Sequence, residues 1–388
     1  MMKKVVVVSA VRTAVGKHLG QWKNTPSDVL AAEVIRESIR RAGIKPEDVE
    51  DVIMGNIHGP HGNHARVAAL RAGLPFESSA TTVDRQCGSG SQAVAIAAMS
   101  IAYGAGDIYV ACGVEHMTLN PYQMNKTTEY SWAPPTYVGS FLAPPEISNI
   151  TMPQTADKLA AMHNITREQC DEFALMSHQR AAKAIKAGIF KDEILPIEVK
   201  SKKGSVVVDT DESVRYDASL ETMTKLKPLY NGGVTTAGNA CPRADGAASL
   251  VLMSEEKAIS LGIKPLAYVK SYATAGCHPD IMGYGPVPAV TKLLERTGLT
   301  IDDIGVVELN EAFAGQSLPC IKDLNIDINK VNPNGGAIAL GHPLGGTGCV
   351  LATKLLYEME REKHQYGIVT MCIGGGQGMA VLYERYTG

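Results

Sequence analysis

The sequence predicts an α/β fold made of two repeated βαβ-rich halves, each with helices flanking a sheet. Strand-like and helix-like segments alternate at both ends of the chain. In addition, residues 42–56 (AGIKPEDVEDVIMGN) match residues 297–311 (TGLTIDDIGVVELNE) at an offset of 255. A second match keeps the same order in both halves. The first half has CGSG at 87–90, then a helical pattern, then YVACG. The second half has LGGTG at 344–348, then a helical pattern, then IVTMCIGGG. Repetition of a unit this large indicates two structurally related halves.

The first half opens with KKVVVVSAV (3–11), a run of β-branched residues that is typical of a buried strand. Residues 27–43 (SDVLAAEVIRESIRRAG) carry apolar side chains at helical spacing, and we expect Ser27 or Asp28 to cap this helix. The remaining elements of this half are expected in order: a strand over 49–57, a helix over 93–103 and a buried strand over 107–113 that ends in glycine.

Residues 115–245 have a different character and predict an inserted loop domain. Their stretch 130–149 is rich in proline, and two helical patterns follow, the second over 166–188 with Thr166 and Gln169 spaced as a capping box. This insertion would cover the carboxyl ends of the strands, where α/β proteins bind their ligands. The expected division is an N-terminal half over 1–114 that takes part of 246–260, the insertion over 115–245 and a C-terminal half over 261–388.

Composition excludes several classes of function. The 388 residues have a formal net charge of −3 and contain no long basic run, so a nucleic-acid or membrane-surface role has little electrostatic support. The eight cysteines show no paired CxxC pattern, which favours free thiols in a reducing compartment. The apolar run at 5–11 is short for a signal peptide, and no run approaches the roughly 18 residues of a membrane span. We therefore expect a cytoplasmic protein.

Cys87 lies between a β-prone run and a helical pattern, which allows two interpretations. Gly88, Gly90 and Ala93 have the spacing of a dinucleotide-binding turn, but such a turn normally follows the first strand of its unit and lacks a cysteine. Alternatively, Cys87 is a nucleophile activated by a helix N-terminus, and the glycines let a bulky thioester approach. A buried structural cysteine is the plain alternative.

Three further stretches carry residues suited to the same chemistry. His342 lies in a Gly/Pro-rich loop before a helical run, where a general base is plausible and a structural histidine is the alternative. Cys372 ends a β-prone run and precedes glycines whose backbone N–H groups suit an anion hole. Asn310 and Glu311 end another strand, where they point into a cleft or cap the next helix. A Cys–His pair activates a thiolate, and a second thiol can move protons at carbon.

A histidine loop also has metal-ligand residues. His58, His61 and His64 follow an H-x2-H-x2-H spacing, but no cysteine or carboxylate accompanies them. We expect this loop to be solvated or to contact another subunit, and we expect no metal site.

Ordered motifs along the chain resemble the signatures of the thiolase family essentially from end to end. They are SAVRT, CGSGSQA, EQCDEFALMSHQRA, GVTTAGNA, DGAA, MGYGPVPA, NEAFA, GGAIALGHPLGGTG and CIGGGQG. In character they are most similar to the acetyl-CoA acetyltransferases (acetoacetyl-CoA thiolases) of that family. The resemblance implies a thiolase-like fold, with the halves packed as a layered α/β/α/β/α core.

The resemblance also implies an activity. Two acetyl-CoA molecules would condense to acetoacetyl-CoA plus CoA, or the reverse thiolytic cleavage would occur, by a ping-pong route through an S-acyl cysteine. CoA and acyl-CoA would be substrates, with no cofactor bound permanently, and the protein would be a homodimer or homotetramer.

Residue roles follow from the same resemblance. Cys87 would carry the acyl group, and His342 would deprotonate it and help to bind the thioester oxygen of the second substrate. Cys372 would move the α-proton of acetyl-CoA. Asn310 would hold a water that completes the first oxyanion hole, while the backbone N–H groups of Cys87 and Gly374 would form the second.

The expected CoA-binding residues are less regular. Arg215 would pack near the adenine, and Met282 would border the acyl pocket. Met152 is also expected to bind the substrate. Cys241 stands in GNACP, where the family commonly has a serine that contacts pantetheine, and Thr151 replaces a histidine. These departures surround the substrate tunnel. They favour, as alternatives, a 3-oxoacyl-CoA thiolase of different chain-length specificity, or a non-catalytic protein of this fold that binds acyl-CoA.

Overall fold

The computed structural model describes residues 2–126, 135–138, 141–201 and 204–388. The described strands of both halves form one ten-stranded sheet in the order β12-β13-β14-β11-β1-β10-β5-β3-β4, with β2 paired to β10. In the first half the strands are β1 Val5–Arg12, β2 Gly16–Lys17, β3 Asp51–Gly55, β4 Ser79–Val83, β5 Ile108–His116 and β10 Ala244–Ser254. In the second half they are β11 Ala267–Gly276, β12 Val306–Leu309, β13 Tyr366–Ile373 and β14 Gln377–Arg385.

The two halves are joined within this sheet by a short contact. β1 pairs with β11 only through Val6 with Tyr268 and Val7 with Ala267. We expected one sheet in each half, and this short antiparallel pairing makes the hydrogen-bonded path continuous from one half to the other.

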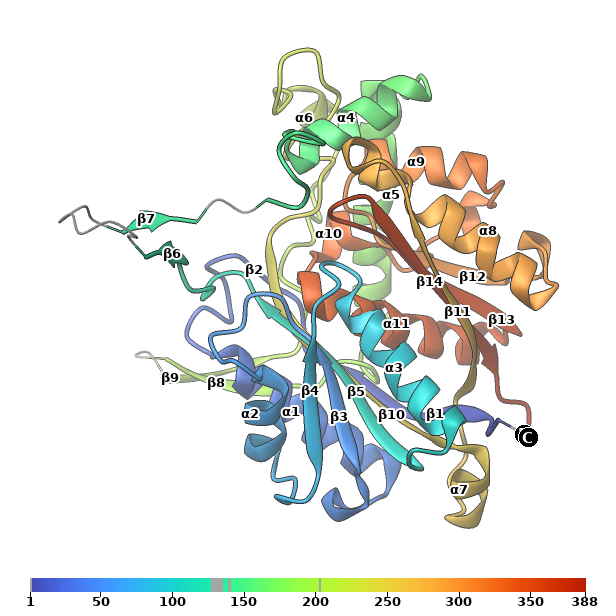
Figure 1. The fold of residues 1–388 in the computed structure, drawn as a ribbon. Coiled ribbons are helices and arrows are strands. Elements are labelled where there is room, and N and C mark those ends of the chain that lie inside the picture. Colours follow the sequence, from blue (N-terminus) through green and yellow to red (C-terminus); the bar gives the residue numbers. More distant parts are fainter. Residues whose placement is uncertain (1, 127–134, 139–140, 202–203) are drawn as a thin grey trace.

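Helices form three layers around the strands (Figure 1). α1 (Ser27–Ala42) and α2 (His64–Ala72) cover the outer face of the first half, and their apolar side chains share one core with β1, β3 and β5. α3 (Ser89–Tyr103) and α11 (Thr347–Glu362) lie side by side between the halves and share a second core with strands of both. α8 (Pro286–Thr297) and α9 (Ala314–Asp323) build a third core on the outer face of the second half. This is the layered α/β/α/β/α arrangement that we expected.

The internal repeat is confirmed at the level of the backbone. α1 and α8 each end at a glycine in the left-handed region, Gly43 at φ 69° and Gly298 at φ 70°. A 3-10 turn follows each of them, Pro46–Asp48 in one half and Ile301–Asp303 in the other, and each turn leads into a strand, β3 or β12. β3 pairs in parallel with β5, as β12 does with β13. The matched sequence windows therefore build matched βαβ units.

Three local predictions were wrong. α1 has Pro26 at its N-cap position, and neither Ser27 nor Asp28 caps it, because Ser27 Oγ lies 2.9 Å from His64 Nε2 and Asp28 pairs with Arg71. The helix after Cys87 begins at Ser89 instead of 93. β5 runs beyond the expected glycine to His116, since its pairing with β10 continues along its whole length.

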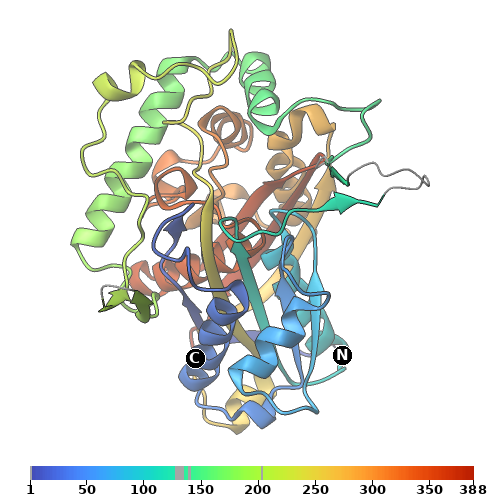
Figure 2. The ribbon, with the colours of Figure 1, turned by 90° about the vertical axis from the view of Figure 1, so that its left-hand side faces the viewer.

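The segment between β5 and β10 packs mainly on the second half. It contains β6 Met124–Asn125, β7 Thr136–Tyr137, α4 Met152–Met162, α5 Arg167–Lys186, β8 Ile197–Ser201, β9 Gly204–Val208 and α6 Leu220–Thr224. α4 and α5 both contact α9, and the β6–β7 pair extends away from the body (Figures 1 and 2). The capping box of α5 is confirmed, because Gln169 N donates to Thr166 Oγ1 and Thr166 N donates to Gln169 Oε1 at 2.9 Å.

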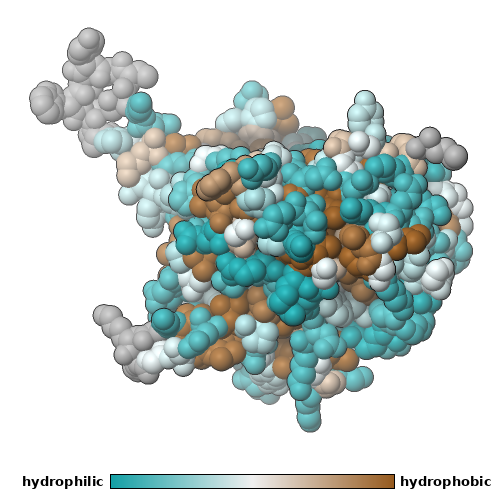
Figure 3. Space-filling view, turned by 90° about the horizontal axis from the view of Figure 1, so that it is seen from below, coloured by the Kyte–Doolittle hydropathy of each residue, from teal (hydrophilic) through white to brown (hydrophobic). Residues whose placement is uncertain are grey.

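The surface fits the modest net charge. On the lower face, Figure 3 shows hydrophilic residues with hydrophobic patches between them. Among the helices of the described ranges, none combines the length and the apolar character that crossing a bilayer requires.

Candidate active site

The predicted reactive residues lie where strands end. Asn310 directly follows β12, and Cys372 is the penultimate residue of β13, the parallel neighbour of β12. Cys87 lies two residues before α3, and His342 lies in the loop between α10 (Ala337–Leu340) and α11. Because α3 and α11 pack against each other between the halves, the two helix starts bring Cys87 and the His342 loop to one place.

A tight turn presents Cys87. The preceding residue, Gln86, has a φ of 47°, a left-handed conformation that is uncommon for a residue other than glycine. Ser89 Oγ fixes the turn, since it accepts from Arg85 N at 2.8 Å and donates to Gln86 O at 2.6 Å. The turn therefore holds the backbone on both sides of the thiol.

The glycines beside Cys87 are packed against neighbouring elements. A Cβ at Gly88 would lie 2.6 Å from Ile373 Cδ1, and a Cβ at Gly90 would lie 2.8 Å from Cys349 N. These two positions must lack a side chain so that β13 and the start of α11 approach α3. Ile373, the residue after Cys372, therefore packs directly on the turn that carries Cys87.

Burial dominates the ionisation of Cys87. Desolvation raises the pKa of its thiol to about 11, although the backbone N–H groups of Gly374 and of Cys87 itself donate toward the sulfur and oppose the rise. We expected the helix start to activate this thiol, and that expectation does not hold for the resting protein, in which the thiol is protonated at neutral pH. It needs a base. The same two N–H groups are the donors expected to form the second oxyanion hole.

His342 is placed to be that base. Its Nδ1 lies 2.6 Å from Thr347 Oγ1, and its Nε2 lies 3.5 Å from Asn310 Nδ2. An amide N–H only donates, so this contact leaves Nε2 as the acceptor and puts the ring proton on Nδ1, toward Thr347. Burial lowers the pKa of His342 to about 4. The imidazole is therefore neutral at neutral pH, and its Nε2 lone pair faces the Asn310 amide.

Asn310 has an orphaned atom in this setting. The residue is buried, and its Oδ1 has no hydrogen-bond partner within the described residues. A buried acceptor without a partner is costly and is commonly satisfied by water or a ligand. This is the atom that could hold the water expected beside His342.

Cys372 is almost fully enclosed, with 1% of its surface exposed. Burial raises the pKa of its thiol well above the usual range, and the neighbouring sulfur of Cys87 adds to the rise. Cys372 packs in a small apolar cluster with Met282 and Phe313, and Met152 contacts the same cluster. The structure thus places Met282, predicted to border the acyl pocket, and Met152, predicted to bind the substrate, at the same cluster as the second thiol.

Of the predicted CoA-binding residues, Arg215 lines an adjoining hollow. The hollow has a volume of about 310 Å³ and runs from the exposed Arg215 to Ala240 and Pro242. Cys241 lies between the last two residues, and burial together with the nearby Cys87 raises the pKa of its thiol to about 12. The hollow therefore connects the surface at Arg215 with the neighbourhood of the nucleophile.

Three polar residues support the site although the sequence had not predicted this role for them. Thr347 orients His342, and its only signal in the sequence is its place in GGTG, five residues after the histidine. Glu115 is the penultimate residue of β5 and accepts from Ile57 N and Gly345 N, and burial raises its pKa to about 7. Glu311, which we had considered as a cleft or cap residue, is buried in a polar network.

The histidine loop takes no part in this site. His64 is buried beside Ser27, and its ring stacks on that of His61 with centroids 5.3 Å apart. In the part of the chain that the structure describes, no group of three or more His, Cys, Asp or Glu side chains is arranged to hold a metal ion.

Burial of neutral His342 should make stability depend on pH. Its pKa is lowered in the folded protein, so the unfolded chain takes up a proton first, and stability is lost as the pH falls from about 6.5 toward 4. Between about pH 7.5 and 5, the free energy of unfolding of the wild type should fall by about 2 kcal/mol more than that of His342→Asn. Urea titrations of both proteins at the two pH values measure this, and equal losses would contradict a buried neutral imidazole.

Comparison with known proteins gives a consistent picture. Residues 5–256 match the family model of the thiolase N-terminal domain, and residues 263–385 match that of the thiolase C-terminal domain. An acetyl-CoA acetyltransferase of Chromobacterium violaceum is 44% identical over 391 residues, which cover 98% of this chain and 100% of the relative. A beta-ketothiolase of Cupriavidus necator is 44% identical over 395 residues, which cover 99% of this chain and 100% of the relative.

Solved structures are also similar to this chain over nearly its whole length. The acetyl-CoA acetyltransferase of Bacillus anthracis superimposes with a TM-score of 0.94 at 42% identity, covering 99% of both chains. Human mitochondrial 3-ketoacyl-CoA thiolase in complex with CoA superimposes with a TM-score of 0.92 at 38% identity, covering 99% of this chain and 98% of the other.

Proposed function

The chain belongs to the thiolase family, and from that premise we propose that Cys87, His342 and Cys372 divide the reaction among them. The protein is a CoA-dependent acyltransferase that makes or cleaves the carbon–carbon bond of a 3-oxoacyl-CoA. The observation that carries the proposal is the arrangement of the half-buried Cys87 thiol and the buried Cys372 thiol near a neutral histidine, with two backbone N–H groups aimed at the Cys87 sulfur. Each feature matches a need of this chemistry.

The first half-reaction transfers the acyl group to the enzyme. His342 Nε2 takes the proton of the Cys87 thiol, and the thiolate attacks the thioester carbonyl of the acyl-CoA. The N–H groups of Cys87 and Gly374 stabilise the oxyanion of the tetrahedral intermediate, a contact whose loss typically costs about 2.7–4 kcal/mol in the transition state. The carbon–sulfur bond to CoA then breaks, and the CoA thiolate recovers the proton from His342.

The second half-reaction forms the carbon–carbon bond. The Cys372 thiol gives its proton to His342 Nε2, and the resulting thiolate removes the α-proton of an acetyl-CoA whose thioester oxygen accepts from that Nε2–H and from a water on Asn310. The carbanion attacks the acyl carbon on Cys87, the bond to the Cys87 sulfur breaks, and that sulfur takes the proton from His342 Nε2. Because an ordinary thioester α-proton is very weakly acidic, both the close base and the oxyanion hole are needed. Thiolysis runs through the same steps in reverse.

CoA and its thioesters are substrates in this proposal, and no resident cofactor takes part. The segment 115–245 would cover the CoA site as an inserted domain between the halves 1–114, with part of 246–260, and 261–388. Its Arg215 would pack near the adenine, and the hollow below it would guide pantetheine past Cys241. We also propose a cytoplasmic homodimer or homotetramer, and the eight free thiols support a reducing compartment.

Acetoacetyl-CoA is the substrate that we propose first, and the acyl pocket offers a test of chain length. Met282 and Phe313 fill the space beside Cys372, which favours a short acyl group. Removing the Met282 side chain in Met282→Ala should raise kcat/KM for a six-carbon 3-oxoacyl-CoA, relative to acetoacetyl-CoA, by about tenfold. Thiolysis rates over a series of four to eight carbons measure the ratio.

A buried methionine far from the site provides the control. Met253→Ala, in the core of the first half, should lower stability without changing the ratio of the two substrates. A wild type that already prefers longer chains would favour the alternative 3-oxoacyl-CoA thiolase. That alternative has its own support in a second hollow of about 340 Å³ against Gly375, lined in part by Leu142, Ile150 and Met152.

A further inference from the structure

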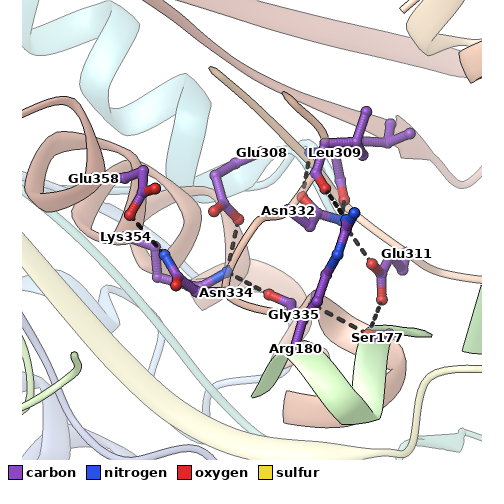
Figure 4. Close-up of polar contacts among 12 residues, drawn as sticks. Ser177, Arg180, Glu308, Leu309, Glu311, Asn332, Asn334, Gly335, Lys354 and Glu358 are labelled. Carbon is purple, nitrogen blue, oxygen red and sulfur yellow. Dashed lines mark hydrogen bonds and ion pairs between the residues drawn. The ribbon is translucent and has the colours of Figure 1, made fainter. Parts of the chain in front are cut away.

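A buried polar network joins the end of β12 to α5 and α10 (Figure 4). Its centre is Glu311, the neighbour of Asn310 in the chain. Glu311 Oε2 accepts from Ser177 Oγ at 2.6 Å and from Ile338 N at 3.2 Å, and its Oε1 accepts from Asn332 Nδ2 at 2.8 Å. The carboxylate therefore joins β12, α5 and α10.

One side of the network fixes the end of β12. Asn332 accepts from Leu309 N at 2.9 Å and donates to Leu309 O at 2.8 Å, so its amide is locked in one orientation. Its remaining N–H then donates to Glu311. Leu309, Asn310 and Glu311 are held as a unit, and the direction of the Asn310 side chain depends on that unit.

The other side fixes the helix that leads to His342. Ser177 Oγ accepts from Gly336 N at 3.1 Å, and Ile338 N donates to Glu311 itself, so α10 is held at its first turn. A Cβ at Gly336 would lie 2.2 Å from Glu311 Cδ, which shows how closely the backbone rests on the carboxylate. His342 follows α10 after a single glycine.

We propose that Glu311 is a positioning residue that sets Asn310 and His342 in register with each other. The inference rests on the proposed function, because it assigns these two residues to one oxyanion hole. They lie on separate segments, and their side chains are 3.5 Å apart. Glu311 is adjacent to Asn310 in sequence and is hydrogen-bonded to α10, the helix that precedes His342. A misplacement of about 1 Å at such a site costs on the order of 100-fold in rate.

Two variants test this role. In Glu311→Gln the side chain keeps its shape, but one of its two oxygens is replaced by an NH₂ group, which donates. In one orientation this group faces Asn332 Nδ2, which is also a donor, and in the other it faces Ile338 N and Ser177. We expect kcat to fall on the order of 100-fold, while KM for acetoacetyl-CoA stays within about twofold, because Glu311 itself does not line the CoA hollow. In Ser177→Ala only the bridge to Gly336 is lost, and kcat should fall about tenfold.

Ser249→Ala is the matched control. Ser249 is also a fully buried serine, and its hydroxyl lies 2.8 Å from Ser38 Oγ, on α1 at the outer face of the first half. It should lose as much thermal stability as Ser177→Ala and keep kcat. A folded Glu311→Gln protein with unchanged kcat would overturn the proposal, as would a Ser177→Ala protein whose kcat matches that of Ser249→Ala.

Ser177→Ala also keeps the proposal testable if Glu311→Gln fails to fold. Thiolysis of acetoacetyl-CoA and acetylation of Cys87 in the wild type are measured alongside. Their absence would refute the proposed function, whereas their presence with unaffected variants would refute only the role of Glu311.

Discussion

Cys87→Ala is expected to abolish acyl transfer, with a loss on the order of 10⁴-fold or more, and to leave CoA binding largely intact. The thiol is the only proposed point of covalent attachment, and a methyl group in its place does not block the hollow that runs from Arg215. Peptide mass spectrometry after a brief pulse of acetyl-CoA, followed by a chase with free CoA, tests the premise. An acetyl group on Cys87 that disappears in the chase is the expected result.

Cys112→Ala is the control for this variant. Cys112 is a buried cysteine of β5 in the core of the first half, and its loss should lower stability but not acyl transfer. If the wild type binds acetyl-CoA and Cys87 never becomes labelled, the chain uses another acyl donor or is the non-catalytic binding protein. Either result would end the mechanism proposed above.

Cys372→Ala should separate the two half-reactions. Acetylation of Cys87 should proceed within a few-fold of the wild-type rate, because His342 and the N–H groups of Cys87 and Gly374 remain in place. Condensation and thiolysis should fall by about 10³-fold, the range typical of losing a general base. The rate of pulse labelling, compared with steady-state turnover, measures the difference.

The result that would contradict this division is an equal loss of both half-reactions. Cys372 would then act on the acylation step or on the shape of the whole site. Cys320→Ala supplies the control, because Cys320 is a buried thiol near Cys372 that packs instead in the core of the second half. It should leave both half-reactions close to their wild-type rates.

Both predictions depend on a site that is uncharged at rest. The thiols of Cys87 and Cys372 have raised pKa values and the imidazole of His342 has a lowered one, all through burial. Every proton transfer therefore creates charge in a low-dielectric space, where fixed N–H donors stabilise it more strongly than they would in water. The enclosure that raises the thiol pKa values is also what makes the oxyanion holes effective.

The sequence alone determined the features that depend on neighbouring residues. The repeat between 42–56 and 297–311, the capping box of α5 and the buried first strand follow from local spacing, and the structure confirms them. The family followed from ordered motifs, because each motif keeps its residues within a few positions of one another. Local hydrogen bonds, helix caps and strand alternation need no knowledge of the rest of the chain.

Tertiary structure decided the features in which distant segments meet. Ser27 does not cap its helix because His64 occupies its hydroxyl, and Gly88 and Gly90 make room for β13 and α11. The Glu311 network joins α5, β12 and α10, which are far apart in sequence. Burial also set the resting charge of Cys87, against the expected effect of the helix start. Desolvation and packing depend on everything that surrounds a group, and that surrounding exists only once the chain has folded.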